Sequence, residues 1–269
     1  MRKVIFTITV VLLLAAFGIS AFMVGNYLME GKKQQELNNE LSQIVSAAQT
    51  EPAETTEEAT QPPETTEETA ATETTEEGGM LPGYKEIYEM NTDTVGWIKL
   101  PGTKLDYPVM QTPSSENYYL YRDFNKADSQ RGSIYAREVC DINEPSDNIT
   151  IYGHNMADGS MFAALNAYVK KDAWEENSLI FFDTLTEYHT YKIFAVFKTS
   201  ANIGQGFSYH KFVDAADEEE FDEFVATCKD LAFYETGITP VYGDKLICLS
   251  TCEYTLDNGR LVVAAVRIT

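Results

Sequence analysis

The chain has 269 residues, of which 44% are hydrophobic, and its formal net charge at pH 7 is −22. A protein this acidic lacks the clustered Lys and Arg side chains that contact phosphate groups, so we do not expect it to bind nucleic acid. Its length allows one or two domains, but one stretch in the first third is too polar and charged to form a folded core.

The N-terminus predicts a membrane anchor. A short basic start precedes an uncharged, mostly apolar stretch from Val4 to about Met29. A helix of that length spans the ~30 Å hydrocarbon core of a bilayer. Basic residues before the span favour a cytoplasmic N-terminus and an extracellular C-terminal domain. The alternative is a cleaved signal peptide, for which Ser20-Ala21 is a poor cleavage site. We therefore expect residues 1–30 to be the cytoplasmic start and the anchor of a single-pass protein of the cell membrane.

Residues 31–79 have the composition of a stalk followed by a tether. A weak helical pattern over 32–49 is typical of a juxtamembrane stalk, or of an extension of the anchor helix. The pentapeptide Glu-Thr-Thr-Glu-Glu then occurs at 54–58, 64–68 and 73–77. Because like charges repel and apolar residues are nearly absent, this stretch predicts a disordered, extended tether.

Residues 80–269 carry the pattern of one folded domain that is mainly β with peripheral helices. Runs of β-branched, aromatic and other apolar residues between turn residues predict strands. These runs are Val95–Leu100, Leu105–Met110, Asn148–Tyr152, Asn177–Phe182, Thr190–Phe197, Lys245–Leu249 and Leu261–Ile268. Helices are predicted at Tyr84–Met90, Met161–Trp174 and Asp214–Tyr234. The acidic residues 217–220 suggest a calcium site, but a helix start favoured by the helix dipole explains them better.

The last two strands predict that Cys252 and Arg260 lie side by side. The residues 257–259 between them, Asp-Asn-Gly, tolerate the positive φ of a tight turn. The strand-turn-strand unit places Cys252 at the end of one strand and Arg260 at the start of its neighbour. A guanidinium beside a thiol favours the reactive thiolate. It can also stabilise the oxyanion that forms when the thiolate attacks a carbonyl carbon.

Such chemistry needs a general acid or base, and the chain offers three histidines. His154 follows the predicted strand Asn148–Tyr152 directly, within Tyr-Gly-His-Asn. For His189 we expect a surface or strand-pairing role, and for His210 a solvated position in a loop. Taken alone, a histidine at the position of His154 favours a structural role over a catalytic one.

These residues together resemble a known family. Residues 249–252, Leu-Ser-Thr-Cys, resemble the L-x-T-C signature of the sortases, although the family usually has Thr where Cys248 stands. With Gly153-His154 upstream and Gly259-Arg260 downstream, the Cys, His and Arg set of that family is complete. The resemblance covers roughly residues 85–269, and its opening segment, Asn-x-Asp-x-Val-Gly-Trp-Ile at 91–98, is similar to class B sortases.

The resemblance implies a fold and a reaction. The fold is a closed β-barrel of about eight strands, with N-terminal helices and a long helix between strands 6 and 7. The reaction is cysteine transpeptidation, in which a C-terminal sorting motif of a secreted protein is cleaved and joined to an amine of the cell wall. Cys252 would be the nucleophile, His154 the general acid and Arg260 the oxyanion partner. Four further residues are candidates for the substrate groove: Leu120, Ser250, Thr251 and Glu253.

Other interpretations of the same residues remain. A pilin lysine could replace the wall amine as acceptor, water could make the enzyme a hydrolase, or the fold could be a non-catalytic peptide-binding module. The chain's four cysteines allow two disulfides, but Cys248 and Cys252 are too far apart along one strand for a relaxed bridge. Cys228 would be a small apolar residue of a helix and Cys140 a free thiol. A zinc site is conceivable, yet no Cys-x-x-Cys pair is present, so we expect neither metal nor cofactor.

Overall fold

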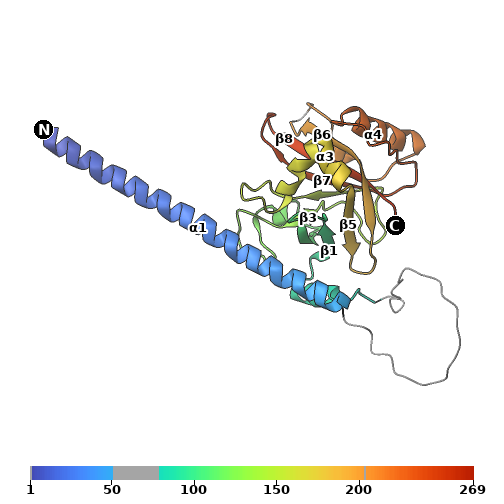
Figure 1. Cartoon of the computed structure of the whole chain (residues 1–269), viewed down its shortest axis with the longest axis horizontal. Helices are drawn as coiled ribbons and strands as arrows, with labels where there is room; N and C mark the ends of the chain where they lie inside the picture. Colours follow the sequence, from blue (N-terminus) through green and yellow to red (C-terminus); the bar gives the residue numbers. More distant parts are fainter. Residues whose placement is uncertain (1, 51–78, 203) are drawn as a thin grey trace, which may run out of the picture. The chain divides into compact units, whose positions relative to one another are not determined.

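A computed structural model describes residues 2–50, 79–202 and 204–269 of the chain (Figure 1). The chain divides into two compact units, one that ends at Leu41 and one that comprises Ser42–Thr269. The Glu/Thr-rich tether predicted over residues 51–77 lies outside the described residues.

The N-terminal segment is one continuous helix, α1 (Arg2–Thr50). The weak helical pattern at residues 32–49 therefore continues the apolar helix and does not form a separate element. Within α1, Ile5–Ala48 contains a window of mean hydropathy 2.5 that is not buried against the rest of the structure. By length and composition this part of the helix can cross a membrane, and a signal sequence near the N-terminus would have the same properties.

The second unit is built on a closed barrel of eight strands in the order β1-β2-β3-β4-β7-β8-β6-β5. Their bounds are β1 (Thr94–Lys99), β2 (Asp106–Met110), β3 (Ile134–Ala136), β4 (Asn148–Tyr152), β5 (Leu179–Thr184), β6 (Thr190–Ser200), β7 (Leu246–Glu253) and β8 (Gly259–Arg267). Two neighbouring pairs, β2 with β3 and β4 with β7, are parallel, and the other pairs are antiparallel. The predicted strands and the predicted closed barrel are confirmed.

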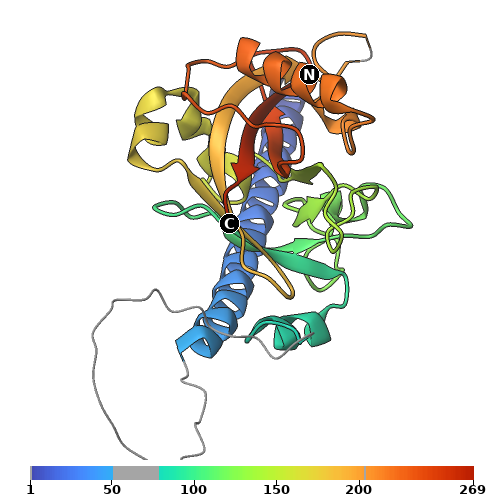
Figure 2. The same cartoon turned by 90° about the vertical axis from the view of Figure 1, so that its right-hand side faces the viewer.

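Strands β7 and β8 are apolar on both faces because they separate two cores. Side chains along a strand alternate between its faces. Those at 247, 249, 261, 263 and 265 belong to one cluster, with residues of β1, β2, β4 and β5. Those at 246, 248, 262, 264 and 266 belong to the other, with the buried residues of helix α4 (Glu218–Asp230). Figures 1 and 2 show α4, in orange, on the outside of the barrel strands.

Helix α4 lies between β6 and β7, as predicted, but is shorter than the expected Asp214–Tyr234. It begins after Asp217, whose carboxylate accepts a hydrogen bond from the backbone N–H of Glu220 at 3.0 Å. This is an N-cap, which satisfies one of the donors left free at a helix start. The acidic run is therefore explained by the helix start.

The helix predicted over Met161–Trp174 is wrong in type. The structure has a 3₁₀ helix, η2 (Phe162–Val169), and a short helix, α3 (Lys171–Glu176), separated by Lys170 in extended conformation. The buried side chains of η2 are Phe162, Leu165 and Tyr168. Their spacing of three residues is the repeat of a 3₁₀ helix and also suits one face of an α-helix. Two single-turn 3₁₀ segments, η1 (Tyr118–Tyr121) and η3 (Tyr209–Lys211), complete the helical elements of the described residues.

The predicted helix α2 (Tyr84–Met90) is present, and Gly83 is its N-cap residue. Gly83 has φ of +80°, and a Cβ at this position would lie 2.9 Å from the Cα of Val45. Only glycine combines this left-handed conformation with so close an approach. The end of α1 from Ser42 onward belongs to the same unit as the barrel, and the hydroxyl of Ser42 donates to a carboxylate oxygen of Asp106 at 3.3 Å.

Candidate active site

Strand pairing brings the three predicted catalytic residues to one place. In the antiparallel pair β7–β8, Cys252 is the direct register partner of Arg260. Strand β7 continues to Glu253, so Cys252 is the second-last residue of the strand, close to the expected position at its end. Strand β4 is parallel to β7 and ends with Tyr152 opposite Ser250. His154 follows β4 at this end of the strand pair.

Gly153 ties the end of β4 to β7. Its N–H donates to the carbonyl of Ser250 at 3.2 Å, and its carbonyl accepts from the hydroxyl of Thr251 at 2.7 Å. A Cβ at Gly153 would lie 2.5 Å from Ile134 and 2.6 Å from Phe162, so the backbone passes closer to the core than another residue would allow. The position of His154 is thus set by a close approach that requires glycine.

A cleft of about 400 Å³ contains the three residues. His154, Cys252 and Arg260 line it together with three of the predicted groove residues: Leu120, Ser250 and Thr251. Glu253 is not among the lining residues. The segment between β6 and α4 contributes Ala201, Tyr209 and His210. His210 is half-buried in this cleft, so it is only partly solvated.

Cys252 differs from the other cysteines in its exposure. All four thiols are free; Cys140, Cys228 and Cys248 are buried, and Cys252 is half-exposed. Burial raises the pKa of the three buried thiols, which keeps them protonated and unreactive. Cys252 is therefore the thiol that a substrate in the cleft can reach.

An asparagine that the sequence did not single out holds the backbone at Cys252. The amide of Asn155 donates to the carbonyl of Cys252 at 2.9 Å. Asn155 is itself held by Asn166, whose amide donates to the Asn155 side-chain oxygen at 2.8 Å. Since Asn155 follows His154 directly, this contact links the histidine loop to the cysteine strand.

The ring of His154 is oriented by a backbone carbonyl. Its Nε2 lies 2.8 Å from the carbonyl oxygen of Leu120. A carbonyl oxygen only accepts hydrogen bonds, so Nε2 carries the hydrogen in this arrangement. The ring of Tyr121 lies beside it, with the two ring centroids 5.7 Å apart. Leu120 and Tyr121 belong to η1, so this short segment fixes both the tautomer and the orientation of His154.

Arg260 has no carboxylate partner among the described residues. Its Nη1 donates to the carbonyl of Gly259 at 2.9 Å and to the side chain of Asn258 at 3.1 Å. These bonds hold the guanidinium at the turn, where Asn258 has the positive φ of 50° that the sequence predicted. A permanent charge that no acidic side chain compensates is available to a thiolate or an oxyanion in the cleft.

The remaining groove candidates are bonded within the protein. Ser250 is 1% exposed, and its hydroxyl lies 2.5 Å from that of Tyr209. Glu253 forms an ion pair with Lys198 at 2.7 Å and accepts the backbone N–H groups of Thr255 and Leu256. Burial alone would raise the pKa of Glu253, but these bonds outweigh it and lower the pKa to about 2. Glu253 therefore braces the β7–β8 turn, and its role in substrate binding stays a prediction.

His189 lies apart from this cleft, in the turn between β5 and β6, where its Nε2 is 3.3 Å from a carboxylate oxygen of Glu187. Its side chain is buried, so the surface role is wrong. Its carbonyl accepts the backbone N–H of Phe182 at 3.1 Å, which agrees with the strand-pairing role. Within the described residues, no group of three or more His, Cys, Asp or Glu side chains is placed to hold a metal ion.

Comparisons with known proteins agree with this geometry. A sequence model of the sortase domain matches residues 98–268. Sortase B of Listeria monocytogenes is 31% identical over 189 residues, which are 69% of this chain and 74% of that protein. Sortase B of Staphylococcus aureus is 29% identical over 186 residues, 68% of this chain and 74% of that protein.

Solved structures show the same fold. The S. aureus sortase B–substrate complex has a TM-score of 0.72 at 26% identity and covers 90% of this chain and 99% of its own. A Bacillus anthracis protein similar to sortase B has a TM-score of 0.71 at 26% identity, with 88% and 96% covered. The barrel, the cleft and these relatives lead to one conclusion: the chain belongs to the sortase family, as a class B sortase and a cysteine transpeptidase.

Proposed function

We propose that this sortase cleaves a C-terminal sorting motif of other secreted proteins through a thioacyl intermediate on Cys252, and transfers them to an amine of the cell wall. The observation that carries the proposal is the register pairing of Cys252 with Arg260 in a cleft that His154 also lines. Nucleophile, cation and acid–base group thus share one site, which a module that only binds peptides would not need.

In the acylation step, the Cys252 thiolate attacks the carbonyl carbon of the scissile peptide bond and an oxyanion forms. Arg260, which has no acidic partner among the described residues, stabilises this oxyanion. When the tetrahedral intermediate collapses, the C–N bond breaks and His154 donates a proton to the departing amine. An acceptor amine then attacks the thioester, its proton passes to His154, and the Cys252 thiolate is released.

The groove that holds the sorting motif would include Leu120, Ser250, Thr251 and Glu253. Leu120 lines the cleft and its carbonyl contacts His154, so a substrate that displaces η1 would also reorient the histidine. Ser250 and Thr251 line the cleft and are nearly inaccessible, at 1% and 2% exposure. We therefore propose that they form the floor of the cleft and determine its shape.

For the whole chain we propose residues 1–30 as cytoplasmic start and anchor, 31–79 as stalk and tether, and 80–269 as the catalytic domain outside the cell. The candidate span in α1 and the basic residues before it support this topology. Protease treatment of intact cells tests it: the catalytic domain should be digested while an epitope at the N-terminus stays protected. Protection of both ends would refute it.

The reaction is tested by intact mass of the full chain in detergent, incubated with a panel of sorting peptides. The wild type should gain the mass of an acyl fragment and lose it when an amine is added. Cys252→Ala should gain nothing, while Cys248→Ala, the matched control at a buried thiol, should still be acylated. Arg260→Ala should acylate ~10²–10³-fold more slowly, as expected when one oxyanion donor is lost. An adduct on Cys252→Ala would place the nucleophile elsewhere and refute the proposal.

The same experiment assigns the acceptor. Thioester breakdown that is fastest with a wall-derived amine supports anchoring to the cell wall. Breakdown that is faster with a lysine-bearing peptide would favour pilin polymerisation, and breakdown at the same rate without any amine would make the enzyme a hydrolase.

A further inference from the structure

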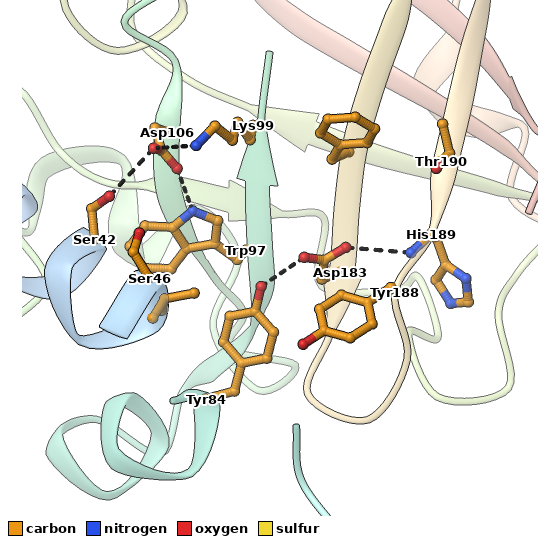
Figure 3. A pocket seen from close by; sticks show the side chains of 12 residues that line it. Ser42, Ser46, Tyr84, Trp97, Lys99, Asp106, Asp183, Tyr188, His189 and Thr190 are labelled. Atoms are coloured by element: carbon orange, nitrogen blue, oxygen red, sulfur yellow. Dashed lines mark hydrogen bonds and ion pairs between the residues drawn. The ribbon is translucent and has the colours of Figure 1, made fainter. Parts of the chain in front are cut away.

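A second cavity, of about 490 Å³, lies on the barrel away from the candidate active site (Figure 3). Its walls come from β1, β2, β5, the start of β6 and the turn before it, helix α2 and the residues 42–46 of α1. In the closed strand order, β7 is the strand farthest from β1, so this pocket and the catalytic cleft lie on opposite sides of the barrel. The two cavities share no lining residue.

The pocket is rich in aromatic side chains. Four of them line it: Tyr84, Trp97, Phe181 and Tyr188. Figure 3 shows the rings of Tyr84 and Tyr188 close to the Asp183 carboxylate, with Trp97 toward Asp106. Aromatic faces carry a negative electrostatic potential and attract cations. The walls therefore suit a ligand that is both apolar along its length and positively charged at one end.

One of the two carboxylates in the pocket is already neutralised. Asp106 forms an ion pair with Lys99 at 3.1 Å and accepts the indole N–H of Trp97 at 2.6 Å. It also accepts the hydroxyl of Ser42 at 3.3 Å. The charges of Lys99 and Asp106 thus cancel, and the pair adds no net charge to the pocket.

The other carboxylate, Asp183, is not matched by a cation. It accepts the hydroxyl of Tyr84 at 2.7 Å and the backbone N–H of His189 at 3.3 Å. No Lys, Arg or His side chain among the described residues forms an ion pair with it. Burial raises the pKa of Asp183 to about 6, against smaller lowering effects from these bonds and from nearby Lys99. At neutral pH it is thus a desolvated, ionised carboxylate that forms no ion pair with a side-chain cation of the described residues.

We propose that this pocket binds a primary alkylamine such as a lysine side chain, with the ammonium on Asp183 and the alkyl chain along the aromatic walls. The ammonium would supply the missing charge and form a charge-assisted hydrogen bond to the carboxylate. An anionic ligand would instead meet an uncompensated negative charge. A neutral ligand such as a sugar would leave Asp183 as it is, so its binding would not depend on that charge.

The experiment uses the full chain in detergent with Cys252→Ala in every sample, which prevents turnover of amines at the catalytic cleft. Isothermal titration compares Nα-acetyl-lysine-methylamide with its Nε-acetylated, uncharged counterpart. We expect binding of the charged probe only, and about tenfold weaker binding by Asp183→Asn, since one charge-assisted contact is lost. Tyr188→Leu, at a position that is 42% exposed, should weaken binding about threefold through loss of a cation–π contact.

The control variant is Glu138→Gln, which removes a carboxylate from the catalytic cleft and should leave binding of the probe unchanged. If Glu138→Gln weakens binding and Asp183→Asn does not, the amine binds in the catalytic cleft and the proposal is overturned. Equal binding of the charged and the acetylated probe overturns it as well. A thermal melt of each variant separates a lost contact from a lost fold.

A pH titration of the wild-type pocket tests the same contact without a substitution in it. The groups that face Asp183 are Tyr84 from α2, Lys99 from β1, and Tyr188 and His189 from the turn before β6. Burial lowers the pKa of His189, so the imidazole is neutral at neutral pH. Binding of the charged probe should therefore weaken as the pH falls through about 6 and Asp183 becomes protonated. Affinity that is constant from about pH 7.5 to about 5, on either side of that pKa, would overturn the assignment to Asp183.

Two probes distinguish the source of the amine. Pentylamine binding as tightly as the lysine probe would point to a small free amine. Tighter binding of a lysine inside a short glycine peptide would point to a lysine on a peptide or protein.

Discussion

Replacing Gly153 by alanine should damage both stability and catalysis, because the backbone at this residue is packed against the core. The added Cβ would lie 2.5 Å from Cδ1 of Ile134 and 2.6 Å from Cγ of Phe162. Ordinary carbon–carbon contacts are ~3.5–4.0 Å, so the overlap is about 1 Å against two side chains that are at most 1% exposed. Overpacking of this kind costs about 1–3 kcal/mol. For a domain of this size each kcal/mol lowers the melting temperature by about 2–4 °C.

The effect on catalysis follows from the two hydrogen bonds of Gly153. To relieve the overlap the backbone must move by about 1 Å, which strains its bonds to Ser250 at 3.2 Å and Thr251 at 2.7 Å. His154 moves with it. Since a misplacement of about 1 Å can reduce a rate by ~10²-fold, we expect Gly153→Ala to form the thioacyl adduct about a hundredfold more slowly. Quenched-flow sampling with intact mass measures this rate, and a thermal melt measures stability.

Gly159→Ala is the matched control. Gly159 lies in the same loop with φ of +81°, and a Cβ added there would meet no atom within 4 Å. This variant should lose about 1 kcal/mol through its left-handed backbone and keep the wild-type rate. If Gly153→Ala acylates as fast as Gly159→Ala, close packing at Gly153 does not position His154 and the reasoning fails.

Three further variants test the fold. The folded-state pKa of Glu253 is about 2, so the stability that it contributes is present above its ordinary pKa of 4.5 and is lost as the pH falls toward 2. In Glu253→Gln, the unfolding free energy measured by urea titration should therefore depend less on pH between 4.5 and 2. Phe224→Ala removes a buried ring that stacks on Phe212 with centroids 4.0 Å apart and should cost about 3 kcal/mol in the same assay. Asp217→Ala removes the cap that accepts the N–H of Glu220 and should cost about 1 kcal/mol; no change would show that the helix start needs no cap.

The parts of the site that the sequence predicts are those set by short connections. Cys252 and Arg260 are joined by one turn, and a tight hairpin turn fixes the register of its strands. The contact from Asn155 to Cys252 spans 97 residues and that from Tyr84 to Asp183 spans 99. No local pattern encodes such contacts, which arise only when the barrel closes. Polar residues in loops therefore went unrecognised, although Asn155 stands directly after His154.

Similar reasons explain where the prediction of the fold succeeded and where it failed. The apolar runs of β7 and β8 indicate buried strands, yet alternation alone does not show that their two faces serve different cores. The helix over Met161–Trp174 was assigned the wrong type because a spacing of three suits both an α-helix and a 3₁₀ helix. The barrel's closure through β1 and β5 was predicted only by family resemblance.

The end of α1 packs in the same unit as the barrel, which determines the effect of a proteolytic cut between them. The last turns of α1, from Ser42, and the barrel belong to one unit, and the chain at 51–78 is the covalent connection between them. A protease that cuts this connection would separate helix α1 from the barrel along the chain. The noncovalent contacts of residues 42–48 with Gly83 and Asp106 would still hold the two pieces together. Release of the barrel from α1 would then be a reversible dissociation, governed by an equilibrium constant as well as by the rate of cleavage.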